Sequence, residues 1–176
     1  MSPSLKLHIK VFLFMGIPYG LALEALNLFI GLDMNTSMVL FTTVCVGLFC
    51  SLTMVNMHKN KLNELGVYKF TNENLGVVQE KLCSSNLTND ELLEKLSEDK
   101  VFGKMKIMSS ENRIILHTKI SWKSCGEIIS INTRRISDEL YEYIIKSEPN
   151  LKTTIIDYGT NYANVKRITS VLGYCA

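Results

Sequence analysis

Two long apolar runs occupy the first third of the chain and constrain its fold more than any other feature. Residues 11–32 contain one charged side chain, Glu24, and residues 38–57 contain none. A transmembrane helix needs about 20 mostly apolar residues to cross a hydrocarbon core of roughly 30 Å, so each run is long enough. The polar residues 33–37 between them favour a turn. Because backbone groups in lipid must be satisfied internally, the sequence predicts a helical membrane hairpin over residues 11–57.

Lysines flank the hairpin and predict its orientation. Two precede the first run and two follow the second: Lys6, Lys10, Lys59 and Lys61. The connecting loop has no base, so the positive-inside rule places both termini in the cytoplasm, in a bacterial inner membrane or a plasma membrane. Residues 1–10 would form a short cytoplasmic N-terminus. The alternative is a signal peptide cleaved near Ala22 or Ala25, which is disfavoured because the apolar run continues past both and contains Glu24.

The charge balance limits the partners that the chain can attract. The 176 residues contain 19 Lys+Arg and 17 Asp+Glu, a formal net charge of +2. Beyond the hairpin the bases and acids nearly cancel, which argues against strong electrostatic capture of nucleic acid. The division into an apolar and a polar part also excludes a single soluble domain, a disordered chain and a disulfide-stapled mini-protein.

Small and polar residues recur along one stripe of the first run, at spacings of three and four. They are Gly16, Gly20, Glu24, Asn27 and Gly31. The second run has a corresponding face with Thr43, Gly47 and Ser51. Gly16 and Gly20 form a G-x-x-x-G pair, which lets another backbone approach closely in lipid. Two interpretations are open: the stripes pack on each other within one hairpin, or they contact a second copy or another membrane subunit. We name these eight residues as the predicted membrane-association residues.

Glu24 lies near the middle of its run, where an isolated carboxylate is costly. Three interpretations compete. The side chain is protonated and hydrogen-bonded inside the hairpin to Thr43, Ser51 or Asn27; it pairs with a basic group on a partner subunit; or it is an ion or proton site in an oligomeric pore. The last is the weakest, because one carboxylate without a second intramembrane charge makes a poor relay.

Residues 60–176 have the composition of an ordinary globular domain, and their patterning predicts an α+β fold. Two short amphipathic helices are expected after Thr71 and after Thr88, where Thr88 and Glu91 form a capping box. Five strands should follow as an antiparallel meander. Their predicted ranges are 102–108, 113–121, 127–135, 139–147 and 151–157. A C-terminal helix over 162–172 should end at Gly173.

No motif for enzymatic chemistry stands out in the sequence. It contains no phosphate-binding glycine loop, no H-E-x-x-H, no C-x-x-C and no G-x-S-x-G. The three histidines are far apart, and no zinc spacing is visible, so we predict no metal, no cofactor and no enzymatic activity. Cys83 and Cys125 would lie in the reducing cytoplasm, where a structural bridge is not expected.

Two positions in the domain are candidates for a ligand or partner. The segment Asp157, Tyr158, Gly159, Thr160 and Asn161 precedes the last helix, where free N–H groups could hold a small ligand or an anion. Ordinary turn and cap chemistry also explains most of it, and that interpretation is favoured. Trp122 is the second candidate, either as hairpin packing or as a partner contact.

These observations predict an integral membrane accessory or scaffolding subunit. Its hairpin would lie in the lipid bilayer and associate with itself or with another membrane subunit, while its domain is presented to a cytoplasmic partner. The alternatives are a membrane-tethered module that senses a lipid or small molecule, and, less favoured, a small channel or transporter subunit that uses Glu24.

Overall fold

The computed structural model describes residues 1–31, 35–120 and 125–173, and the chain divides into two compact units. The first unit is Met1–Leu75 and the second is Gly76–Ala176. The segment from residue 60 to residue 75, assigned to the domain on sequence grounds, is therefore grouped with the helices.

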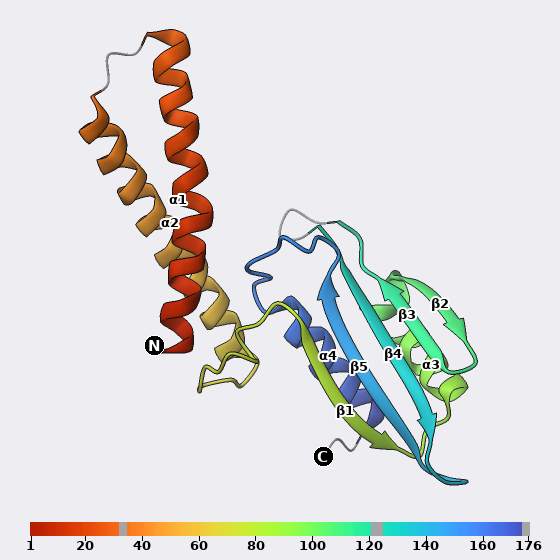
Figure 1. The fold of residues 1–176 in the computed structure, drawn as a ribbon. Helices are drawn as coiled ribbons and strands as arrows, with labels where there is room; N and C mark the ends of the chain where they lie inside the picture. The colour runs from red at the N-terminus through yellow and green to blue at the C-terminus, as the bar shows by residue number, and fades with distance from the viewer. Residues whose placement is uncertain (32–34, 121–124, 174–176) are drawn as a thin grey trace. The chain divides into compact units, whose positions relative to one another are not determined.

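The first unit contains two long helices, α1 (Pro3–Ile30) and α2 (Thr36–Glu64) (Figure 1). Both include the predicted apolar runs and extend beyond them, because their caps lie in the polar flanks. The side chain of Ser2 accepts a hydrogen bond from the Leu5 amide, and that of Asn35 accepts one from the Met38 amide. Gly31 ends α1 in the left-handed conformation (φ 67°). Both helices are long and apolar enough to cross a membrane.

The helix predicted after Thr71 is wrong. Thr71 does form the expected cap, since the Asn74 amide donates to its hydroxyl (3.3 Å) and the Leu75 amide to its carbonyl (3.2 Å). The turn stops there, because Gly76 and two β-branched valines follow, which disfavour a helix. The next residues, Gln79–Ser85, instead form strand β1.

The second unit is a five-stranded antiparallel sheet covered on one face by helices (Figure 1). Its strands are β1 (Gln79–Ser85), β2 (Lys106–Ser110), β3 (Arg113–His117), β4 (Glu127–Arg135) and β5 (Tyr141–Pro149). Strands β2 to β5 form the predicted meander. The spatial order β1-β5-β4-β3-β2 shows that β1 completes the sheet at the β5 edge. The strand expected over 102–108 starts later, because Phe102–Lys104 form a 3-10 turn, η1.

The fifth strand predicted over residues 151–157 is also wrong. The Thr154 amide and hydroxyl both donate to the Leu151 carbonyl, at 3.0 and 2.7 Å, and close a turn. The edge of β5 that faces away from β4 pairs with β1, in a register that places Leu82 opposite Ile144. A meander strand after β5 therefore has no edge to join.

Two helices cover the sheet: α3 (Asn89–Glu98) and α4 (Thr160–Leu172). The capping box at Thr88 and Glu91 is confirmed, and Gly173 caps α4 as expected. Alternate residues of β3, β4 and β5 point toward the helices and are fully buried, including Ile114, Ile129 and Tyr143. Burial raises the pKa of Tyr143 to about 12, and its hydroxyl donates to the Leu87 carbonyl. Among the described residues of the second unit, one α-helix, α3, precedes β2, where two short helices were predicted.

Cys83 lies in this core and is disulfide-bonded, whereas Cys45, Cys50 and Cys125 are free. The bond contradicts the expectation that Cys83 forms no structural bridge.

Candidate functional site

The two glycines of the G-x-x-x-G pair lie in the interface between α1 and α2. A Cβ added at Gly16 would stand 3.5 Å from the Gly47 Cα, and one added at Gly20 would stand 2.6 Å from the Thr43 hydroxyl. At Gly47 an added Cβ would be 2.8 Å from the ring of Phe12. The small residues thus let the two helices cross closely, as G-x-x-x-G pairs do in lipid. For Gly16, Gly20, Thr43 and Gly47, the contacts are those of the first interpretation, packing within one hairpin.

A polar contact fixes the opposite end of the same interface. The hydroxyl of Ser51 donates to the His8 carbonyl (2.9 Å) and lies 3.0 Å from the His8 Nδ1. Ser51 is buried, with 3% of its surface exposed. Hydrogen bonds across helices stabilise association in an apolar environment. Ser51 therefore serves the hairpin itself.

The remaining stripe residues lie on the loop side of this contact. Figure 1 shows α1 and α2 crossing in the first half of α1 and separating toward the loop. Glu24 and Asn27 are half-buried, and Gly31 has no atom within 4 Å of an added Cβ. Among the described residues, no hydrogen bond or ion pair involves the Glu24 carboxyl, so none of the predicted bonds to Thr43, Ser51 or Asn27 is formed. The Thr43 hydroxyl donates instead to the Val39 carbonyl (2.7 Å).

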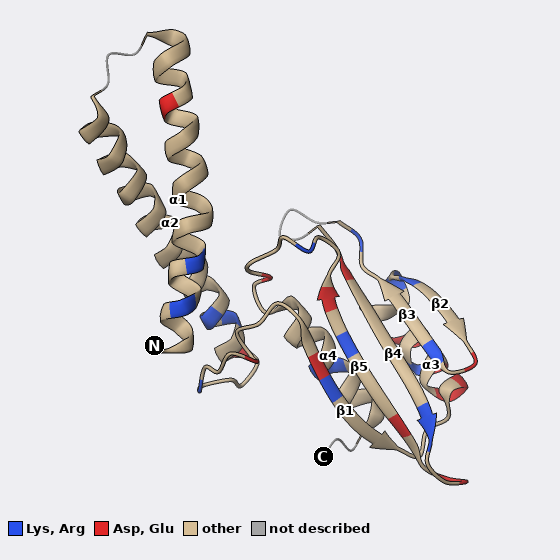
Figure 2. Ribbon diagram, in the orientation of Figure 1, with Lys and Arg blue, Asp and Glu red and all other residues tan. Residues whose placement is uncertain are grey.

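The outer surface of the hairpin is largely apolar between its flanking lysines. Phe29 is 90% exposed, Leu28 79% and Phe41 69%, and many other large apolar side chains of both helices are exposed. A helix that is apolar all round belongs in a protein core or a membrane. Figure 2 shows the charged residues concentrated at the end of the hairpin that contains the start of α1 and the end of α2.

The Asp157–Asn161 turn is a buried cap for α4. The carboxylate of Asp157 accepts hydrogen bonds from the Gly159 amide (3.1 Å), the Asn161 amide (2.8 Å) and the Asn161 side chain (2.8 Å). Asn161 in turn accepts a hydrogen bond from the Ser147 hydroxyl on β5 (2.6 Å). Tyr158 and Gly159 both adopt positive φ, 52° and 72°. The Gly159, Thr160 and Asn161 amides are thus occupied by Asp157, which supports the cap interpretation.

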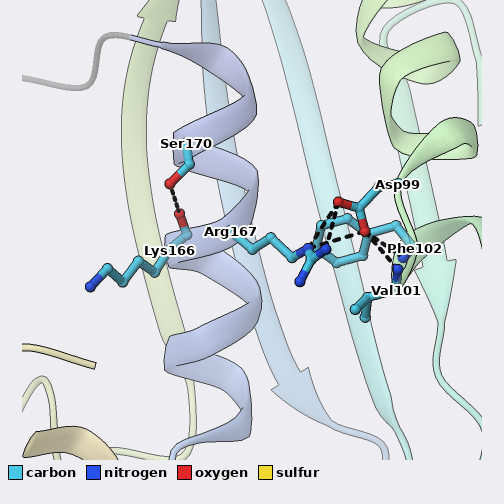
Figure 3. A network of polar contacts seen from close by, with 6 residues as sticks. All are labelled: Asp99, Val101, Phe102, Lys166, Arg167 and Ser170. Carbon is cyan, nitrogen blue, oxygen red and sulfur yellow. Dashed lines mark hydrogen bonds and ion pairs between the residues drawn. The ribbon is translucent and has the colours of Figure 1, made fainter. Parts of the chain in front are cut away.

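A second acid, the partly buried Asp99, joins α4 to the segment after α3 (Figure 3). Its carboxylate accepts hydrogen bonds from the Val101 and Phe102 amides (2.7 and 3.0 Å) and pairs with the Arg167 guanidinium at 2.9 Å. Burial raises the pKa of Asp99, but the two amides and Arg167 outweigh it and hold the pKa below its ordinary 3.8. The guanidinium also lies 5.9 Å from the centre of the Phe102 ring.

Sequence reasoning missed this network, because its members lie 68 residues apart. Only the local part of the network is visible in the sequence. Asp99 lies two and three residues before Val101 and Phe102, whose amides donate to it, and this is the spacing of an Asx turn.

A small cavity of about 200 Å³ lies between β1 and α4. Its lining is Gln79, Glu80, Lys81, Tyr162, Val165, Lys166 and Thr169. Ligand pockets for drug-sized molecules are usually about 300–1,000 Å³, so this one would suit a smaller group.

Two other predictions concern Trp122 and metal binding. Trp122 lies outside the described residues. Across residues 1–31, 35–120 and 125–173, no group of three His, Cys, Asp or Glu side chains converges in a way that could hold a metal ion.

Comparison with known proteins adds no relative to this picture. The chain matches no protein-family model, no curated protein and no solved structure.

Proposed function

We propose that this chain is an integral membrane accessory or scaffolding subunit, which associates with a partner through its hairpin and presents its α+β domain at the membrane surface. One observation carries the proposal: both long helices expose large apolar side chains all round. Apolar patches of this extent are unstable in water and mark a membrane or protein contact. The polar contacts inside the hairpin leave its outer surface to lipid and to a partner.

The two termini are proposed to face the cytoplasm. Lys6 and Lys10 belong to the first turns of α1, and Lys59 and Lys61 to the last turns of α2. Figure 2 shows basic residues gathered at the end of the hairpin where α1 starts and α2 ends, which supports this orientation. The disulfide of Cys83 argues for the opposite side, because structural disulfides persist in oxidising compartments. We give the lysines precedence, because flanking charge acts while the chain inserts, whereas the state of a cysteine depends on redox conditions afterwards.

The domain is proposed to act by binding and not by catalysis. Its sheet leaves one face uncovered, where Leu82, Ile115 and Ile144 alternate with charged side chains. Mixed apolar and charged surfaces of this kind are typical of non-obligate protein contacts. The proposal that the protein is not an enzyme rests on the missing motifs in its sequence.

Two measurements test insertion and orientation. Insertion predicts that the protein stays in the membrane pellet at alkaline pH and leaves it in detergent; release at alkaline pH would contradict it. Orientation can be measured on Cys125, which is free and exposed, with Cys125→Ser as the control. A membrane-impermeant maleimide should label Cys125 in inverted vesicles and not in intact cells, and the reverse pattern would place the domain outside.

A second candidate function is sensing of a small molecule at the cavity between β1 and α4. The cavity lining carries two amines, Lys81 and Lys166, against one carboxylate, Glu80, and this net positive charge favours a small anionic group. Binding would stabilise the folded chain in proportion to ligand concentration. A thermal shift with inorganic phosphate or acetate that is lost in Lys81→Ala would support this function, and no shift would count against it.

A further inference from the structure

The structure separates the predicted association stripe into two parts with different roles. Gly16, Gly20, Thr43 and Gly47 are used inside the hairpin, as their close approaches show. Glu24 is not used there. If the hairpin spans a membrane, as proposed above, the surface left for a partner must therefore be sought around Glu24 and not along the glycines.

Glu24 lies at the boundary between the hairpin interface and the outer surface. Residues three and four positions apart lie on one face of a helix. Toward α2, the neighbours of Glu24 are Gly20 and Asn27; away from it they are Leu21 and Leu28, which are 67% and 79% exposed. We call Leu21, Glu24 and Leu28 the Glu24 face. Glu24 itself is half-buried, so its side chain is within reach of a neighbouring transmembrane helix.

Nothing in the hairpin can neutralise an ionised Glu24. Among the described residues its carboxyl has no hydrogen bond or ion pair, and residues 11–57 contain no Lys, Arg or His. A second copy of the chain would bring the same acidic span and again no base. An acid within a transmembrane segment is costly unless it is paired, and such residues mark contacts with a partner group.

We propose that the Glu24 face docks a transmembrane helix of a different protein, one that carries a Lys or Arg at the depth of Glu24. The inference rests on the proposed function and adds the chemistry of the partner. In this proposal the glycines do not contact the partner. They let α1 and α2 pack closely, and the resulting hairpin presents Glu24.

The test uses the full chain in phosphatidylcholine vesicles with a leucine-rich transmembrane peptide of about 20 residues. A lysine at the centre of the peptide reaches the middle of the bilayer in either orientation. Peptides with a central Gln or Leu are the matched probes, and association is measured by resonance energy transfer. We expect the Lys peptide to bind at least about tenfold more tightly than the other two.

Two variants of the chain complete the experiment. Glu24→Gln keeps the shape and hydrogen-bonding capacity of the side chain but removes its charge, and should abolish the preference for the Lys peptide. Glu64→Gln, which removes a carboxylate beyond the apolar run of α2, should leave it unchanged. Equal binding of the Lys and Leu peptides would overturn the inference. Equal binding of the Lys and Gln peptides would also overturn it, in favour of a neutral contact with a second copy.

The proposed function and this inference fail in different ways. A complex that persists in native membranes with Glu24→Gln contradicts the inference and leaves the scaffolding function intact. A wild-type chain that is monomeric in native membranes contradicts the scaffolding function, whatever the peptide binding shows.

Discussion

The two units of this chain differ in where they keep their apolar side chains. In the α+β domain, the core side chains of β3, β4 and β5 are fully buried against α3 and α4. In the hairpin, α1 buries three of its 28 residues, Leu7, Val11 and Gly16, and exposes most of its large apolar side chains. The domain therefore has a buried core of its own. The hairpin is held together by small residues at the helix contact and leaves most of its large apolar side chains exposed.

The largest loss of stability is expected when a core side chain of the domain is truncated. Leu96→Ala in α3 removes a fully buried side chain and should destabilise the domain by about 2–5 kcal/mol. Leu82→Ala, at a 53% exposed site on β1, and Leu28→Ala on α1 should each cost about 0.5 kcal/mol or less. Urea unfolding of the full chain in detergent measures all three. A large loss from Leu28→Ala would show that α1 has a core of its own.

The second prediction concerns the cap of α4. Asp157→Ala leaves the Gly159 and Asn161 donors without their acceptor in a buried site, at a cost of roughly 2–3 kcal/mol. Asp157→Asn keeps one oxygen acceptor and should recover part of the loss. Thermal unfolding distinguishes the variants. If Asp157→Ala had wild-type stability, the carboxylate would be available for a ligand, and the sensing function would gain support.

The third prediction concerns the shape of the hairpin. Gly20→Leu places atoms where the Thr43 side chain lies, and overpacking of this kind costs about 1–3 kcal/mol. We expect α1 and α2 to move apart by about 1–2 Å, since helix separation depends on side-chain size at the contact. Spin-label distances between exposed positions of the two helices measure it. Ala22→Leu, on the exposed side of α1, is the matched control, and an equal shift there would contradict the assigned interface.

The smallest effect is expected at the Asp99–Arg167 pair. Because the pKa of Asp99 is lowered in the folded state, its contribution is complete above the unfolded value near 3.8 and is lost as pH falls through the folded pKa. Asp99→Asn should cost about 1 kcal/mol at neutral pH, a modest amount because Arg167 is partly exposed. The difference in unfolding free energy between wild type and variant should close below about pH 4. A gap that stays constant down to the lowest pH would contradict the pairing.

Local chemistry predicted much of this fold. The apolar runs predicted α1 and α2, the capping box predicted α3, and β4 has the predicted bounds of 127–135. These signals are contained within a few residues, so a single sequence reveals them. The C-terminal helix was found for the same reason.

The errors arise where a local signal is cut short by the next residues or where residues distant in the sequence decide. Thr71 carries the same cap chemistry as Thr88, yet Gly76 stops the turn and β5 recruits the following residues as β1. Residues 151–157 have strand-like composition but no free edge to join. The sequence placed Gly16 and Glu24 in one stripe, but in the structure Gly16 packs against Gly47 of α2, whereas Glu24 lies half-buried at the boundary of that contact.

The central claim is that the hairpin holds this chain in a complex within the membrane. The most direct test is the native mass of the protein purified in mild detergent from its own membranes. The account predicts a discrete particle heavier than the 19.9 kDa chain that contains a second membrane protein. A clean 19.9 kDa monomer would contradict it.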